Sequence, residues 1–123
     1  MSNPDAIVVM MTAANREEAA RLADMLVGAR LAACVQILPE MESVYRWKGN
    51  IERQPEVLLI AKTLRSRFAE LERAVRALHS YDTPEIIAIP MAAGSRRYLE
   101  WLVANVESPP GTATAEKSRD ATA

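Results

Sequence analysis

The sequence predicts an α+β fold in which one β-sheet packs against helices. Three runs of consecutive apolar residues, at 7–11, 57–61 and 86–89, are rich in Val, Ile and Leu and predict buried strands. Between these runs, apolar residues recur at helical spacing in two segments that begin near Asn15 and Ser66. Strand-like and helix-like patterns alternate along a chain of 123 residues, which fits one domain with one core.

The first helix has recognisable signals at both of its ends. Asn15, with Glu18 three residues later, predicts a helix N-cap with a capping-box acid, and Gly28 is expected to end the helix. Residues 31–38 then predict a second strand, which Pro39 interrupts.

A long β-hairpin is predicted next. Extended structure resumes at 43–48, and Lys48-Gly49-Asn50 has the composition of a tight turn. The chain then returns from Ile51 as an antiparallel partner and ends in the apolar run 57–61. The hairpin therefore has a polar tip and an apolar base.

A second helix, a last strand and a third helix complete the predicted order. Ser66 is expected to cap the second helix, the strand at 85–89 is stopped by Pro90, and a short helix follows Gly94. Strand, helix, hairpin, helix and strand form the βαββαβ pattern of a ferredoxin-like sandwich, here with an extra C-terminal helix.

The domain is assigned to residues 6–106. Residues 107–123 are rich in Ser, Pro, Gly, Thr, Ala and Lys, and such a segment buries too little apolar surface to order itself. We therefore expect a disordered C-terminal tail.

Composition argues against several classes of function. The formal net charge is −1 and no basic cluster occurs, so we expect no nucleic-acid partner. The single cysteine cannot form an internal disulfide, and no apolar run is long enough to span a bilayer. Without a leader-like N-terminus, the expectation is a cytoplasmic protein with no membrane partner.

The strands themselves predict self-association. The runs at 7–11, 57–61 and 86–89 are apolar on both faces, yet the two crossover helices of this topology cover only one. Another subunit is the expected cover for the other face. Tyr45 and Trp47 alternate onto one face of the hairpin and suit an interface core, although they could instead roof their own domain.

Several separated motifs resemble those of the CutA family, the divalent-cation tolerance proteins, over about residues 6–105. The matching segments are Thr12-Ala13, Leu31-Ala32-Ala33-Cys34-Val35, residues 43–52, Glu56, Lys62-Thr63, His79 with Tyr81, residues 83–86 and residues 98–102. The resemblance implies a non-enzymatic homotrimer, similar in fold to the nitrogen-regulatory PII proteins, with long hairpins that extend onto neighbouring subunits.

The resemblance also implies copper binding. In the family, this is attributed to a cysteine on the first strand and to a histidine pair before a Tyr-x-x-Pro-Glu turn. Here the strand position is Met11 and the first histidine is replaced by Leu78, so only His79 matches. The candidate ligands for copper or another divalent cation are His79 and Met11, whose thioether suits Cu(I). Alternatively, His79 is a capping or hydrogen-bonding residue at a helix end.

A second candidate site is a small-ligand cleft between subunits. Lys62 ends an apolar strand, where a charge is costly unless it is paired or lies at a cleft edge. Clefts at subunit boundaries are common ligand sites, and intersubunit ion pairs fit these residues equally well. The candidate cleft residues are Cys34, Tyr45, Trp47, Lys62, Tyr81 and Glu85.

Catalysis is not expected. Cys34 and His79 would form a nucleophile pair only with an acid partner and an oxyanion hole, and no motif supplies either. Cys34 alone is better explained as a small buried residue. The four glycines do not cluster into a phosphate-binding loop. The alternative to ion binding is therefore a stable trimeric scaffold with a protein partner, or a sensor with a small ligand.

Overall fold

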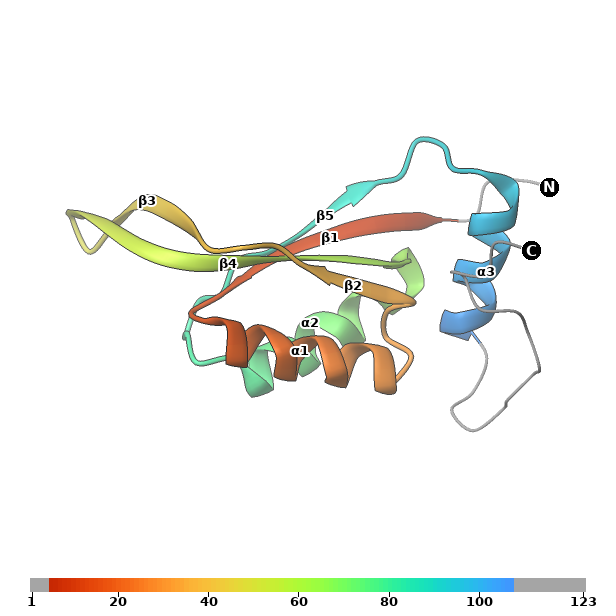
Figure 1. Ribbon diagram of the computed structural model, residues 1–123, viewed down its shortest axis with the longest axis horizontal. Coiled ribbons are helices and arrows are strands. Elements are labelled where there is room, and N and C mark those ends of the chain that lie inside the picture. Colours follow the sequence, from red (N-terminus) through yellow and green to blue (C-terminus); the bar gives the residue numbers. More distant parts are fainter. Residues whose placement is uncertain (1–4, 108–123) are drawn as a thin grey trace.

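The computed structural model describes residues 5–107 and contains one antiparallel sheet with three helices (Figure 1). The strand order is β2-β4-β1-β5, and β3 pairs with the outer part of β4. The elements are β1 (Ala6–Ala13), α1 (Arg16–Gly28), β2 (Cys34–Ile37), β3 (Met41–Trp47), β4 (Asn50–Leu64), a 3-10 turn (Arg65–Arg67), α2 (Phe68–Leu78), β5 (Ile86–Pro90) and α3 (Arg96–Glu107). The α+β class and the predicted order of elements are confirmed, with the first hairpin strand divided into β2 and β3.

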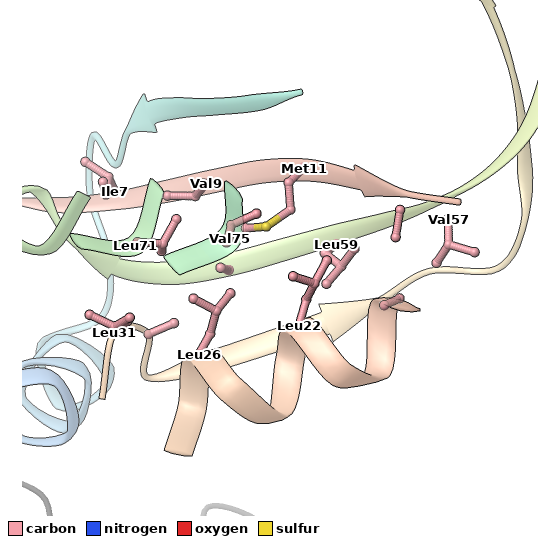
Figure 2. Packing of buried hydrophobic residues seen from close by; sticks show 14 residues of the cluster. Ile7, Val9, Met11, Leu22, Leu26, Leu31, Val57, Leu59, Leu71 and Val75 are labelled. Atoms are coloured by element: carbon pink, nitrogen blue, oxygen red, sulfur yellow. The ribbon is translucent and has the colours of Figure 1, made fainter. Parts of the chain in front are cut away.

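One face of the sheet carries the main core, against α1 and α2. Figure 1 shows both helices beneath this face, and Figure 2 shows side chains from β1 and β4 meeting those of the two helices. Met11, Leu59 and Leu22 are fully buried there. Burial of a Leu, Ile or Met side chain contributes about 1.5–3 kcal/mol, so this layer is the chief source of stability in the single chain.

The opposite face is apolar but largely uncovered. Cross-strand pairs share a face, and the register pairs Val8 with Ile89 and Met10 with both Ile87 and Ile60. Ile87 and Ile89 are 48% and 46% exposed. We call this surface the open face; its members are Val8, Met10, Leu58, Ile60, Ile87 and Ile89.

The third helix covers only one end of the sheet. Leu99, Leu102 and Val106 of α3 form a second core cluster with Ala6 and Leu64, and Figure 1 shows α3 at that end. The last carbonyls of α3 accept hydrogen bonds from two arginines elsewhere in the chain. These bonds run from Arg30 to Asn105 and from Arg67 to Val106, each at 3.3 Å. Cations at a helix C-terminus also oppose its negative dipole end, which helps to fix α3 there.

The N-cap of α1 is confirmed, and the helix ends at Gly28 as predicted, although this glycine does not take the left-handed conformation. The Asn15 side chain accepts a hydrogen bond from the Glu18 amide at 2.8 Å. Gly28 is the last helical residue, and the left-handed position falls on Arg30, with φ of 58°. The amide of Leu31 returns to the Leu26 carbonyl at 2.9 Å, so backbone bonds close the helix without a glycine in the left-handed position.

The second strand is shorter than the predicted 31–38, since β2 covers only Cys34–Ile37. Residues 31–33 are buried and lead from the helix to the sheet: the amides of Leu31 and Ala32 donate to the Leu26 carbonyl, and the amide of Ala33 donates to Lys62 of β4. The Thr63 hydroxyl of β4 also donates to the Leu31 carbonyl at 2.7 Å. A strand pattern in sequence cannot distinguish such a short apolar connection from a strand.

Ser66 does not cap α2, which corrects a second prediction. It lies inside the 3-10 turn, and α2 begins at Phe68 with no side-chain cap. The chain is held at this point by the Arg65 amide, which donates to the Asp5 carbonyl at 2.7 Å. That long-range backbone contact places the turn before the helix, and the local sequence does not reveal it.

The hairpin of β3 and β4 projects beyond the sheet (Figure 1). Trp47 pairs with Asn50, and the two turn residues, Lys48 and Gly49, have φ of 50° and 83°. Two positive φ values define the type I′ turn that matches the twist of paired strands, so the predicted tight turn is confirmed.

The boundary of the C-terminal tail moves by one residue. Glu107, which we assigned to the tail, is the last residue of α3, and residues 108–123 lie outside the described part of the chain. Within residues 5–107, none of the helices is both long and apolar enough to cross a membrane.

Candidate functional site

A pocket of about 530 Å³ lies where the hairpin joins the sheet. Its walls come from β3, the end of β1, one residue of β4 and the turn between α2 and β5. Pockets of this size bind small molecules in many proteins. The lining residues are Thr12, Ser43, Val44, Tyr45, Trp47, Glu56, Tyr81, Asp82, Thr83 and Glu85.

Aromatic side chains form one side of this pocket. Tyr45 and Trp47 alternate along β3 and therefore project from the same face of the hairpin. They are 40% and 48% exposed, so each ring presents a large surface to an incoming group. A third ring, that of Tyr81, comes from the turn after α2.

The Glu56 carboxylate is a buried acidic group of the pocket. Glu56 is only 7% exposed, and its Oε2 accepts a hydrogen bond from the Tyr81 hydroxyl at 2.9 Å. Burial, and after it the bond to Glu56, raises the pKa of Tyr81 to about 12. Tyr81 therefore stays protonated at neutral pH and donates to the carboxylate.

A hydrogen-bonded cluster around His79 fixes the turn that carries Tyr81. His79 Nε2 lies 2.7 Å from the Thr12 carbonyl, and its Nδ1 accepts from the Tyr81 amide at 3.0 Å. Because Nδ1 is an acceptor, the ring proton sits on Nε2, which donates to Thr12. The imidazole thus ties the end of β1 to the turn.

Glu18 completes this cluster from the first turn of α1. Its two carboxylate oxygens accept from the amides of Ala14 at 2.8 Å and Ser80 at 2.7 Å. Burial by itself raises the pKa of Glu18, but hydrogen bonds from the Ala14 amide and from the side chain and amide of Ser80, together with the nearby His79, outweigh it, so that the pKa is lowered on balance. The predicted capping-box acid reaches Ala14 and the distant Ser80 rather than the Asn15 amide.

Comparison with known proteins identifies the family. The CutA1 divalent ion tolerance protein family matches residues 7–105. The chain belongs to this family. It is 47% identical over 98 residues to the divalent-cation tolerance protein CutA of Thermus thermophilus, which covers 80% of this chain and 95% of that protein. It is 50% identical over 96 residues to the chloroplastic CutA of Arabidopsis thaliana. That match covers 78% of this chain and 53% of the relative, so the chain spans about half the length of the plant protein.

Solved CutA structures have the same fold. The Thermus thermophilus structure superimposes with a TM-score of 0.81 at 46% identity and covers 82% of this chain and 98% of that one. The Oryza sativa structure gives 0.83 at 45% identity, with coverages of 86% and 98%. The resemblance predicted from the motifs is therefore confirmed at the level of family and fold.

The two candidate copper ligands, His79 and Met11, are both engaged in the single chain. Met11 is fully buried in the helix-facing core, where Figure 2 shows its side chain between the sheet and α2. The His79 side chain is fully buried and uses both ring nitrogens in hydrogen bonds. Among residues 5–107, no group of three or more His, Cys, Asp or Glu side chains could hold a metal ion. His79 therefore has the geometry of the hydrogen-bonding alternative, and metal ligation by His79 and Met11 stays a prediction.

The structure divides the six predicted cleft residues between two places. Tyr45, Trp47, Tyr81 and Glu85 line the pocket. Cys34 and Lys62 do not; they pair across β2 and β4, nearer to α3. An extended strand rises about 3.3 Å per residue, so the six residues from Glu56 to Lys62 separate them by roughly 20 Å.

Cys34 and Lys62 have their own partners. The Cys34 Sγ lies 3.5 Å from the Tyr98 hydroxyl, and the Lys62 ammonium donates to the Gln36 side chain. Within one chain, four of the six candidate cleft residues line this pocket and these two lie elsewhere; a cleft between subunits stays a prediction.

Several pocket residues were not predicted from the sequence. Glu56 was noted only as a family match, and neither Thr12 nor Asp82 was predicted to line a site. The available signal was the carboxylate at the start of an otherwise apolar run, since a buried acid needs a partner from another element. That partner is Tyr81, whose place depends on the His79 cluster.

Proposed function

We propose that this chain is a non-enzymatic homotrimer that acts in divalent-cation tolerance and binds copper or a similar divalent cation weakly. Family membership supports the general role, because the relative from Thermus thermophilus is named a divalent-cation tolerance protein. Its place of action is proposed to be the cytoplasm.

The observation that carries the assembly is the open face. A strip of Val, Met, Leu and Ile on three adjacent strands is uncovered in one chain, and monomers rarely leave such a surface in water. The projecting hairpin adds a second contact element, since a two-stranded ribbon is marginally stable alone. Closed rings of identical subunits satisfy both features.

Assembly also bears on the metal. Within the described residues of one chain no three-donor group exists, so a site built from one chain would be incomplete. A trimer supplies each donor three times, which could complete a coordination shell from one residue per chain. The hydrogen bonds of His79 would have to break for ligation, and that cost accounts for weak binding.

The absence of enzymatic activity is proposed on the same geometry. The Cys34 thiol contacts Tyr98, and the His79 ring is committed to Thr12 and Tyr81, so neither activates the other. Activation of a nucleophile requires a base within hydrogen-bond reach.

Calorimetric titration with Cu²⁺ tests the metal proposal. Saturable binding by the native protein that is lost in His79→Ala, with Glu18→Gln retaining it, is the expected pattern. Glu18→Gln is the matched control because it loosens the same cluster and keeps the imidazole. Equal binding by all three proteins removes His79 from the site, and the absence of saturable binding by the native protein refutes copper binding.

The pocket favours a second candidate function, a sensor that binds a small ligand. A concave site of about 530 Å³ with aromatic walls and one deeply buried carboxylate has the usual character of such sites. This function does not exclude the first, since the pocket and the His79 ring occupy neighbouring but different positions.

A further inference from the structure

The Glu56 carboxylate lacks a countercharge. It is 7% exposed, its recorded partner is the neutral Tyr81 hydroxyl, and it forms no ion pair with any residue in 5–107. A buried carboxylate is costly unless a cation or several donors compensate it. The remaining compensation must come from the pocket side.

The rest of the pocket is suited to a positive charge. Asp82 and Glu85 add two more carboxylates, and among residues 5–107 no Lys, Arg or His lines the pocket. Tyr45 and Trp47 line the same pocket, and aromatic faces attract cations at distances up to about 6 Å.

A bare metal ion is a poor match for these surroundings. Its coordination shell needs several close oxygen, nitrogen or sulfur donors. Among the described residues, no three His, Cys, Asp or Glu side chains lie close enough together to supply them. An alkylammonium ion needs only a carboxylate for its charge and aromatic or aliphatic walls for its carbon atoms.

We infer that this pocket binds a small organic cation, with its ammonium group directed to Glu56 and its alkyl part against Tyr45 and Trp47. The inference rests on the proposed ligand-sensing function and names the chemical class of its ligand. Ammonium and guanidinium side chains share this chemistry, so another subunit's hairpin could supply Arg46, Lys48 or Arg53 instead; the free small molecule is our choice because the pocket volume far exceeds one side-chain head group.

Three probes of similar shape and different charge test the inference. Tetramethylammonium is the cation, tert-butanol the neutral analogue and pivalate the anion. Each is titrated into the full-length protein while the indole resonances of both tryptophans are followed by nitrogen-edited NMR. Trp47 lines the pocket, and Trp101 of α3 serves as the internal reference. We expect saturable shifts of Trp47 with tetramethylammonium only.

Two carboxamide variants locate the charge. Glu56→Gln keeps the shape and can still accept from Tyr81, and it should weaken tetramethylammonium binding about tenfold. Glu52→Gln makes the same charge change on the same hairpin outside the pocket and should leave the affinity unchanged.

The outcomes separate this inference from the proposed functions. Equal binding of all three probes would keep a ligand pocket but overturn its selectivity for cations. No binding, with a lower assembly state in Glu56→Gln, would assign the pocket to a neighbouring subunit's cation and overturn the inference. No binding with assembly unchanged would overturn both the inference and the sensor function. The Cu²⁺ titration of the His79 variant tests the metal proposal, and its result does not depend on any of these outcomes.

Discussion

The two faces of the sheet use the same strands for opposite purposes. On β4, Leu59 is fully buried against the helices, while its neighbours Leu58 and Ile60 turn to the open face. On β1, Met11 is buried and Met10 faces the opposite way toward Ile87. Both faces are equally apolar in sequence, so hydrophobicity alone does not distinguish an interior from an interface. The helices decide which is which, because they pack on one face only.

The largest expected effect concerns the helix-facing side. Leu59→Ala leaves a cavity in a fully buried layer and should lower the free energy of unfolding by about 2–5 kcal/mol. Urea denaturation measures it. Ile51→Ala, at a hairpin residue that is 67% exposed, is the control and should change stability little. Similar losses for the two variants would contradict the assignment of the core.

A charge on the open face should act on assembly instead. Ile87→Lys places an ammonium where we propose that another subunit packs, so light scattering should show the mass falling from three copies to one. Val27→Lys is matched in exposure, 44% against 48%, but lies on α1 and should leave the mass unchanged. A full-mass Ile87→Lys protein would rule out this face as the interface.

The segment His79–Tyr81 lies between the helix-facing side of the sheet and the pocket. Glu18 of α1 holds this segment from the helix side and gives a pH-dependent prediction. The pKa of Glu18 is lower in the folded chain than its ordinary value of 4.5. Its contribution is therefore fully present above pH 4.5 and is lost as the pH falls through the folded value. Glu18→Gln should cost about 1–3 kcal/mol at neutral pH.

The difference in the free energy of unfolding between Glu18→Gln and the native protein should become smaller at acidic pH, where the native carboxylate is also neutral. Denaturation at a series of pH values measures it. Glu17→Gln changes an exposed acid in the same helical turn and should show no such narrowing. A constant cost of Glu18→Gln at every pH would mean that its charge is not involved.

The smallest effect is expected on the pocket side. The pKa of Tyr81 is raised from 10.0 to about 12, so its stabilising contribution is complete below pH 10 and disappears as the pH rises through 12. Tyr81→Phe should cost about 1 kcal/mol at neutral pH. In an alkaline absorbance titration it should remove a late-ionising tyrosine of the three present. If a late-ionising tyrosine is still seen in Tyr81→Phe, the raised pKa does not belong to Tyr81 and does not come from the bond to Glu56.

The sequence by itself determined the order of elements. Runs and periodicities are local properties, so the buried strands, the Asn15 cap, the turn at Lys48-Gly49 and the apolar second face could all be predicted. The motif order likewise sufficed for the family. The geometry of the helix ends was less predictable. The local bond from the Leu31 amide to Leu26 closes α1 without a left-handed glycine, and the long-range bond from the Arg65 amide to Asp5 holds the start of α2 without a serine cap.

Only the tertiary structure decided the site. Which polar residues meet depends on the register of β4 with β1 and β3, and on the conformation of the turn held by His79. These brought Glu56 to Tyr81 and left Lys62 with Gln36 at the other end of the strand. Contacts between distant segments follow from the packing of whole helices and strands, so they cannot be predicted from the local spacing of residues.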